Sequence, residues 1–413
     1  MRISDQAYNR HKILKAIRGQ GPISRTELTM LTGLSGATIT EITADLLERG
    51  LVCEHRGPAT GRGRPRTQLS IDPQGGLVIG ATLIDNGVIS SSFVDLAGER
   101  LFSSEKQMGA RATLHEYANA IADVLGDAIA ASPFEPGAID RIALTLPALV
   151  DSQTGVVHWM TTFDEPPCPF AEIIAERLDI PVTVENDSPC LARAEHWFGK
   201  ARSLDDFSLF HVGVWLDGAQ YVDGLPRLGA NGFNAEAGHV KTDLTANART
   251  CVCGSKGCVA VYGTIYGVLL GSGRLADFDI RSPFGLGAAF RQLADEAQNG
   301  DGEAARHFVE AGEHLGVAIA NHINAFDPAN VFVLMTERRF MDLVTPALIQ
   351  SVARNVFKPL GERTTIEVAM VEDDWRWKGT AAHALEQTYL GENKRRTRKL
   401  APLVGTEMEL PRP

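Results

Sequence analysis

The chain has 413 residues, of which 44% are hydrophobic and 22% are charged. This length and balance describe a folded chain of two or three domains and exclude collagen, coiled-coil rods and wholly disordered proteins. The longest weakly polar run, residues 259–271, is shorter than the ~20 apolar residues that cross a bilayer, and residues 1–10 lack the apolar core of a signal peptide. We therefore expect a cytoplasmic protein with no membrane partner.

Charge is distributed unevenly along the chain. The formal net charge is −11, but residues 1–70 hold eleven Lys and Arg against six Asp and Glu, a balance of +5, which leaves −16 for the remainder. A small basic head on an acidic body indicates that the head binds a polyanion while the body has another task.

Three short helices are predicted in the head. Apolar residues at helical spacing predict the first helix over residues 9–19. Ser24 and Glu27 have the spacing of a capping box, which opens a second helix that stops at Gly33. Ser35 is placed to cap a third helix with one apolar face. This succession of short, capped helices is typical of a helix-turn-helix.

A predicted hairpin completes the head. Residues 51–53 and 68–71 predict two strands, joined by a cationic loop that contains Arg62 and Arg64. Residues 1–71 therefore predict a winged helix-turn-helix that binds double-stranded DNA through its third helix and wing. The candidate DNA-binding residues are Ser35, Ala37, Thr38, Thr40, Arg62 and Arg64. The alternative is a helical module for protein contacts with a solvated Arg-rich loop.

Strands and helices alternate in the acidic body, which predicts an α/β fold. Strands are expected over residues 77–84, 87–95, 141–146 and 181–185, and helices over 114–131, 171–178 and 186–197. A second set has strands over 208–215, 220–222 and 331–334 and a helix over 304–326. The repetition implies two similar lobes, residues 77–200 and 201–390, with a last helix that returns towards the first lobe. Residues 391–413 are predicted to form a basic, mobile tail.

One cysteine cluster indicates a metal site. Cys251, Cys253 and Cys258 follow the pattern C-x-C-G-x-x-G-C, and His239 precedes them, so that one imidazole and three thiolates are supplied. This donor set is expected for a closed tetrahedral zinc site, in which four protein ligands leave no position for a catalytic water. The alternative is a loop of reduced cysteines without metal.

The chain resembles the ROK family, which groups repressors, open reading frames and sugar kinases, and in particular its branch of transcription regulators with a winged-helix head. The resemblance spans about residues 9–385 and is carried by segments 94–98, 146–157, 181–187, 229–232, 236–239 and 251–258. It implies a two-lobed, actin-like sugar-kinase fold. It also implies that the zinc bound by His239, Cys251, Cys253 and Cys258 is structural.

The nucleotide half of the family's kinase site is not present in the sequence. Where family kinases have glycines that let backbone N–H groups approach the ATP phosphates, this chain has Trp215, Asp217 and Ala219. Residues 82–87 lack the family's Asp and Gly-Gly, and residues 335–337 replace a Gly-Gly that supports adenosine. Because phosphoryl transfer depends on positioning the phosphates, we expect no ATP cofactor and no enzymatic activity.

The sugar half of that site is retained in part. Asn186, Asp187, Glu236 and His239 match family positions that contact a hexose, and His239 would donate from the ring nitrogen that zinc leaves free. Ala260 replaces a usual glutamate, and the family's Pro-Asn is not found around residues 158–159. These departures argue against a glucose-type ligand and leave a different sugar, a modified sugar, a sugar phosphate or no ligand.

Together these features predict a DNA-binding transcriptional regulator of sugar-related genes, most often a repressor in this family. As a homodimer or tetramer it would bind a pseudo-palindromic operator, and a sugar or sugar derivative would act as its effector. Two alternatives stay open. One is an active sugar kinase with an appended DNA head, in which Asp187 is the base. The other is a protein-docking regulator that does not respond to sugar.

Overall fold

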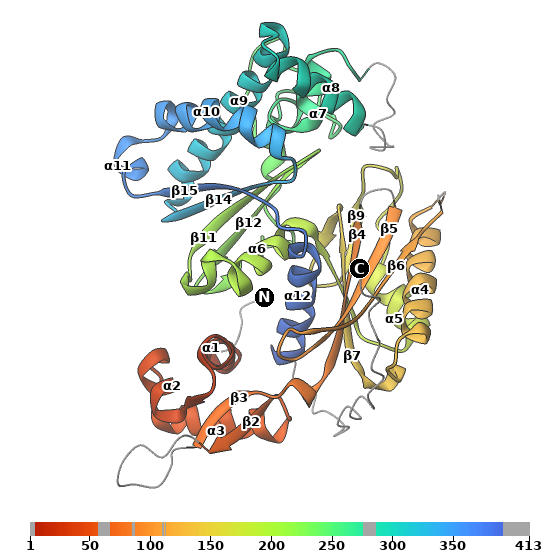
Figure 1. Ribbon diagram of the computed structural model, residues 1–413, viewed down its shortest axis with the longest axis vertical. Helices are drawn as coiled ribbons and strands as arrows, with labels where there is room; N and C mark the ends of the chain where they lie inside the picture. The colour runs from red at the N-terminus through yellow and green to blue at the C-terminus, as the bar shows by residue number, and fades with distance from the viewer. Residues whose placement is uncertain are drawn as a thin grey trace, which may run out of the picture.

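The computed structural model describes residues 5–56, 67–84, 87–109, 111, 113–275 and 286–390 (Figure 1). The predicted wing arginines Arg62 and Arg64, the turn at residues 85–86 and the tail over residues 391–413 lie outside these ranges. Within the ranges, no helix combines the length and apolar character needed to cross a bilayer.

The described part of the head contains three helices and a three-stranded antiparallel sheet. Its elements are α1 (Asp5–Gln20), β1 (Ile23–Ser24), α2 (Arg25–Thr32), α3 (Gly36–Glu48), β2 (Val52–Arg56) and β3 (Thr67–Ile71), with sheet order β1-β3-β2. The predicted capping box is present, because Ser24 Oγ accepts from the Glu27 amide and Glu27 Oε2 accepts from the Ser24 amide at 2.8 Å. Ser35 caps α3. The order of these elements is that of a winged helix, with β1 added to the two predicted strands.

The body contains two sheets with the same strand order. Over the described residues, the first sheet has the order β10-β7-β4-β5-β6 and the second has β13-β12-β11-β14-β15. In each sheet, three consecutive strands form an antiparallel meander and two later strands add in parallel beside the first of the three. This repeat agrees with the two lobes predicted from the sequence.

The strand bounds follow the prediction closely in the first lobe and less closely in the second. The first sheet contains β4 (Leu77–Ile84), β5 (Val88–Asp95), β6 (Arg100–Gln107), β7 (Ile139–Leu146) and β10 (Val182–Asn186). The second contains β11 (Phe207–Val212), β12 (Leu216–Val222), β13 (Leu225–Pro226), β14 (Asn330–Met335) and β15 (Thr365–Met370). A separate hairpin, β8 (Leu149–Asp151) and β9 (Val156–Trp159), follows β7.

Helices cover both faces of each sheet (Figure 1). Helices α4 (Leu114–Ala131) and α5 (Phe170–Leu178) share a core with the outer face of the first sheet. Helix α6 (Asp187–Phe198) packs against the second sheet, whose other face shares a core with α7 (Ile265–Gly271), α8 (Leu286–Gln298), α9 (Gly302–Phe326) and α10 (Arg338–Asn355). The short helix α11 (Lys358–Gly361) precedes β15.

Helix α12 (Trp375–Leu390) follows the second sheet in the chain but packs on the first. Residues of β4 alternate between the two faces, so that Ile79 faces α4 while Val78 faces α12. A Cβ atom at Gly80 would lie only 2.8 Å from the Ala381 amide nitrogen, so glycine permits the close approach of this helix. Thr380 Oγ1 lies 2.7 Å from Thr145 Oγ1, within hydrogen-bond distance, which ties α12 to β7.

Candidate functional site: a cysteine–histidine cluster beside an acidic pocket

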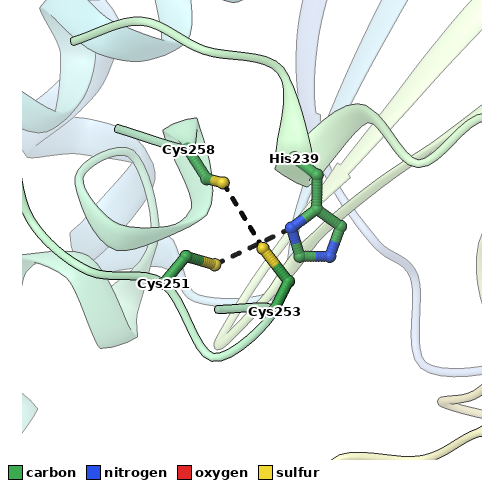
Figure 2. A group of neighbouring side chains, drawn as sticks. All are labelled: His239, Cys251, Cys253 and Cys258. Atoms are coloured by element: carbon green, nitrogen blue, oxygen red, sulfur yellow. Dashed lines mark hydrogen bonds between the residues drawn. The ribbon is translucent and has the colours of Figure 1, made fainter. Parts of the chain in front are cut away.

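His239 and three cysteines converge in the second lobe (Figure 2). Their candidate ligand atoms all lie within 4.8 Å of one another. Cys253 Sγ is 3.7 Å from Cys258 Sγ, and Cys251 Sγ is 3.7 Å from His239 Nδ1. Around a tetrahedral zinc with Zn–S bonds of about 2.3 Å, neighbouring sulfurs are about 3.8 Å apart. The four predicted ligands therefore have the spacing that a zinc ion requires.

The loop that carries the cysteines depends on two glycines. Gly254 and Gly257 have φ angles of +83° and +77°, which a residue with a side chain rarely adopts. A Cβ atom at Gly257 would also lie 1.8 Å from the carbonyl oxygen of Asp243. Lys241 Nζ donates to Cys258 Sγ at 2.7 Å, and this hydrogen bond raises the pKa of Lys241. This contact places a positive charge beside the sulfur cluster.

A pocket lies between the lobes, on the other side of His239. The side chains of Asn186, Asp217, Glu236 and His239 line it, together with the indoles of Trp159 and Trp215. His239 Nδ1 faces Cys251, whereas its Nε2 lies 3.9 Å from Glu236 Oε2. Burial, and then the nearby Lys241, lower the pKa of His239. One ring nitrogen thus faces the sulfur cluster, and the other lies towards Glu236 at the pocket.

Asn186 and Asp187 stand at the junction of β10 and α6. Asn186 Oδ1 caps the helix by accepting from the Ser188 amide at 2.9 Å, and its Nδ2 donates to the Ala148 carbonyl at 3.1 Å. Asp187 is not needed as the cap. Its Oδ2 lies 3.9 Å from His211 Nδ1, and its buried Oδ1 has no hydrogen-bond partner among the described residues. Asp187 is not among the described residues that line the pocket, although the sequence predicts that it contacts a sugar.

Asp217 joins this group, although the sequence assigned it only to the altered phosphate hairpin. It lies on β12 and lines the same pocket as Asn186 and Glu236. Burial raises the pKa of Asp217 well above its usual value, and the carboxylates of Asp187 and Glu236 add to the shift. The Asn186 side chain, which hydrogen-bonds to Asp217, acts in the opposite direction. Burial also raises the pKa of Glu236.

The backbone segment that carries Glu236 and His239 packs closely against strand β12. Both belong to the short helical turn at residues 236–239, where a Cβ atom at Gly238 would lie 2.3 Å from the Leu216 carbonyl oxygen. Trp215 is held beside the pocket by Tyr266, with ring centroids 5.0 Å apart. The sequence placed Trp215 in the lost phosphate hairpin and gave no role to Trp159. The fold makes both indoles part of the pocket wall.

The model of the ROK family matches residues 74–387. The chain belongs to the ROK family. A xylose repressor of Caldicellulosiruptor bescii is 24% identical over 375 residues, which cover 88% of this chain and 92% of that repressor. The DNA-binding transcriptional dual regulator NagC of Escherichia coli is 26% identical over 374 residues, which cover 89% of each chain.

A solved ROK structure extends the comparison to the head. The crystal structure of a ROK family transcriptional regulator, a homologue of the Escherichia coli Mlc protein, matches with a TM-score of 0.75 and 23% identity. The match covers 93% of this chain and 98% of that one, which is more than residues 74–387 provide. The shared fold therefore includes much of the head as well as the ROK body.

A buried ion network lies directly behind the pocket of this ROK body. Glu185 Oε1 accepts from Ser152 Oγ at 2.6 Å and from Asn234 Nδ2 at 2.9 Å, and Glu185 Oε2 is 3.5 Å from Arg193 Nη1. Arg193 Nε donates to Glu386 of α12 at 2.9 Å. Burial alone would lower the pKa of Arg193, but the Glu386 carboxylate raises it above the usual range. The network joins two loops of the pocket to α6 and α12.

The head of the ROK chain contacts both lobes through α1. On the side of the second lobe, Lys15 Nζ donates to Asp205 Oδ1 at 2.9 Å and His11 Nε2 lies 3.2 Å from the Gly224 carbonyl oxygen. At the end of α6, the Arg18 guanidinium lies 3.3 Å from the centroid of the Trp197 ring. Trp197 in turn donates from Nε1 to Glu386, a member of the buried network. Helix α1 is thus connected, through Trp197, to the buried network behind the pocket.

The predicted DNA-contacting residues of α3 are at its free N-terminal end. Ser35, Ala37 and Thr40 are exposed and Thr38 is half-buried. The hydroxyls of Ser35 and Thr38 lie 2.8 Å apart, and Ser35 Oγ also accepts from the Thr38 amide at 3.1 Å. Thr40 donates to the Gly36 carbonyl at 2.8 Å. Ala37 alone has no polar group, so it permits close approach to α3.

Proposed function

We propose that this protein is a DNA-binding transcriptional regulator, a repressor by analogy with its relatives, and that its ROK body binds a carbohydrate between the lobes. In this proposal residues 1–71 form the DNA-binding head, and residues 77–200 and 201–390 form the lobes. The zinc at His239, Cys251, Cys253 and Cys258 has a structural role. The relatives support the regulatory function, since one is a xylose repressor and another a DNA-binding transcriptional regulator.

The observation that carries the proposal is the position of α1 across the two lobes. Lys15 contacts Asp205 near the second sheet, and Arg18 contacts Trp197 at the end of α6. A ligand that changes the separation of the lobes would strain one of these contacts and thereby shift the head between two arrangements. A coupling free energy of about 1–3 kcal/mol would change operator affinity about 5–150-fold.

The proposal assigns no phosphoryl transfer to the body. Trp215 and Asp217 line the pocket where family kinases have glycines, and a carboxylate repels the phosphates of ATP. A coupled assay of ATP turnover with a panel of hexoses tests this assignment. A rate that disappears in Asp187→Asn would establish the kinase alternative instead.

Selection of bound fragments from genomic DNA with the full chain is the first experiment. We expect recovered fragments to share a pseudo-palindromic sequence, because a homodimer or tetramer presents two heads related by symmetry. Replacement of Arg62 and Arg64 by Ala should then weaken binding to all duplexes and reduce the log–log salt slope by about 0.9 for each lost phosphate contact.

The matched control for this test is Arg177→Ala, on the surface of the body, which should leave the salt slope unchanged. Failure to enrich any DNA would contradict the regulatory proposal. Anisotropy titrations of a recovered operator, with and without sugars, then measure the coupling to the pocket.

A further inference from the structure

The charges that face the pocket are almost all negative. Asp217 and Glu236 line it, and the Asp187 carboxylate is close enough to act on Asp217. Among the described residues that line the pocket, none is a lysine or an arginine. Carboxylates this close repel one another, and burial adds a further cost to their charged forms.

The cationic side chains near the pocket are engaged elsewhere. Arg193 is paired with Glu386 and Glu185 behind the pocket, and Lys241 donates to Cys258 on the far side of His239. His239 uses Nδ1 towards the cysteines. His211 faces the Oδ2 atom of Asp187, which leaves Asp187 Oδ1 without a partner among the described residues. Among the described lysines and arginines, none is therefore paired with Asp217 or Glu236.

The other walls of the pocket suit a cation that also carries an apolar ring face. The indoles of Trp159 and Trp215 line it, and indole faces attract ammonium groups as well as the C–H faces of sugars. Ala260 also lines the pocket, at the position where a glutamate is usual in the family. Ala260 adds no charge to this wall, so Asp217 of β12 and Glu236 are the acidic residues among the described lining.

We propose that Asp217 is a specificity-determining residue that selects an amino sugar with a free, protonated amine over neutral and anionic sugars. The ammonium would donate to Asp217 and Glu236, which both line the pocket, while Asn186 contacts a hydroxyl. A sugar phosphate is excluded because its charge would meet the carboxylates of Asp217 and Glu236. The inference rests on the proposed function, since it assumes that the pocket is the effector site.

Calorimetry with the full, zinc-loaded chain at pH 7 tests the inference. The probes are D-glucosamine, D-galactosamine and D-mannosamine, each compared with its parent hexose and its N-acetyl derivative, together with D-glucose 6-phosphate. We expect at least one free amino sugar to bind about tenfold or more tightly than its parent and its N-acetyl form, and no binding of the phosphate. Equal affinity for amine and parent, or no binding by any amine, would overturn the inference.

Two variants of Asp217 test whether its negative charge, rather than the shape of the side chain, produces the preference for an amino sugar. Asp217→Asn should reduce amino-sugar affinity about tenfold or more while neutral sugars change little, whereas Asp217→Glu should retain the preference. Asp373→Asn, an exposed carboxylate on the same chain, is the matched control. An unchanged preference in Asp217→Asn, with unaltered zinc content and circular dichroism, would overturn the inference. The inference would also be overturned if the wild-type chain bound Ca²⁺ without sugar and Asp217→Asn did not, because the pocket carboxylates would then form a cation site.

Operator affinity measured beside the calorimetry distinguishes this inference from the proposed function. An amino sugar that binds through Asp217 without altering operator affinity would support the inference and contradict the sensor function. A neutral sugar that alters operator affinity as strongly as any amine would support the sensor function and overturn the inference.

Discussion

Two acidic groups lie on either side of the end of β10, and the chain treats them differently. Glu185 is fully buried, accepts two side-chain hydrogen bonds and faces Arg193, which also binds Glu386. Two residues later, Asp187 belongs to a group with Asp217 and Glu236 that has no arginine or lysine among the described pocket residues. The first group is paired with an arginine inside the protein, whereas the second has no arginine or lysine partner among the described pocket residues.

This difference separates structural charges from ligand-binding charges. A buried ion pair holds its surroundings in one arrangement, because removal of either partner leaves an isolated charge at low dielectric. An unpaired carboxylate group destabilises the free protein, and a ligand that neutralises it recovers that free energy on binding. The four predictions below test the contrast, from the largest expected effect to the smallest.

Loss of a zinc ligand should have the largest effect on stability. A bound zinc ion neutralises the negative charge of the buried thiolates, as Arg193 does for Glu185 and Glu386. Cys258→Ser should abolish stoichiometric zinc binding and unfold the loop over residues 240–262, because structural zinc contributes ~10–16 kcal/mol of apparent binding free energy in small zinc-finger peptides. Elemental analysis and thermal unfolding measure the two effects. Cys168→Ser, at a cysteine outside the cluster, should keep its metal. One zinc per chain in Cys258→Ser would exclude that sulfur as a ligand.

Loss of the buried arginine is expected to come next. Arg193→Met leaves Glu185 and Glu386 buried without a cation and should lower the free energy of unfolding by about 3–5 kcal/mol, as measured by urea denaturation. Arg177→Met removes a surface partner of Asp123 and should cost less than about 1 kcal/mol. Similar values for the two variants would show that the network behind the pocket is not structurally important.

Removal of a carboxylate from the acidic pocket should raise the stability of the protein, whereas removal of Arg193 should lower it. Because the pKa of Asp217 is raised in the folded protein, its protonated form stabilises the fold. That contribution is complete below the ordinary aspartate pKa and is lost as pH rises through the raised folded value. Asp217→Asn should therefore raise the melting temperature at pH 8 and have progressively less effect towards acidic pH. Asp373→Asn should show no such trend, and a destabilised Asp217→Asn at pH 8 would assign Asp217 to the structural group.

The contact between α1 and the second lobe should contribute least to stability. Lys15→Ala removes a partly exposed ion pair with Asp205 and should cost less than about 1 kcal/mol of unfolding free energy. It should nevertheless reduce the effector-induced change in operator affinity, because α1 then loses one of its contacts with the body. Lys12→Ala, on the same helix, is the control. If the effector changed operator affinity equally in both variants, the Lys15–Asp205 contact would not transmit the effect of ligand binding to the head.

Short-range patterns in the sequence were sufficient for much of this architecture. The Ser24–Glu27 capping box, the helix at residues 114–131 and the strand at residues 77–84 occur where the sequence predicts them. The four zinc-site residues also come together, because the three cysteines are fixed by their spacing. These features are determined within a few residues, so local chemistry is enough to find them.

Other features depend on contacts that sequence spacing does not reveal. The sequence does not predict strand β6, because RLFSSEKQ lies at the sheet edge, is mostly exposed and carries three charged residues without an alternating apolar pattern. Asp217 was interpreted only as an obstacle to phosphate, since nothing local shows that β12 places it beside Asn186 and Glu236. Arg193 and Glu386 are 193 residues apart, and only the return of α12 pairs them.

The return of α12 has a consequence for how the protein is made. Gly80 and Thr145 belong to strands near the start of the body, yet they are covered by Ala381 and Thr380. While the ribosome is still synthesising the second lobe, helix α12 is absent, so the inner face of β4 and β7 is uncovered. A nascent first lobe is therefore an incomplete folding unit that exposes apolar surface, and we expect it to engage chaperones until almost the whole body has emerged.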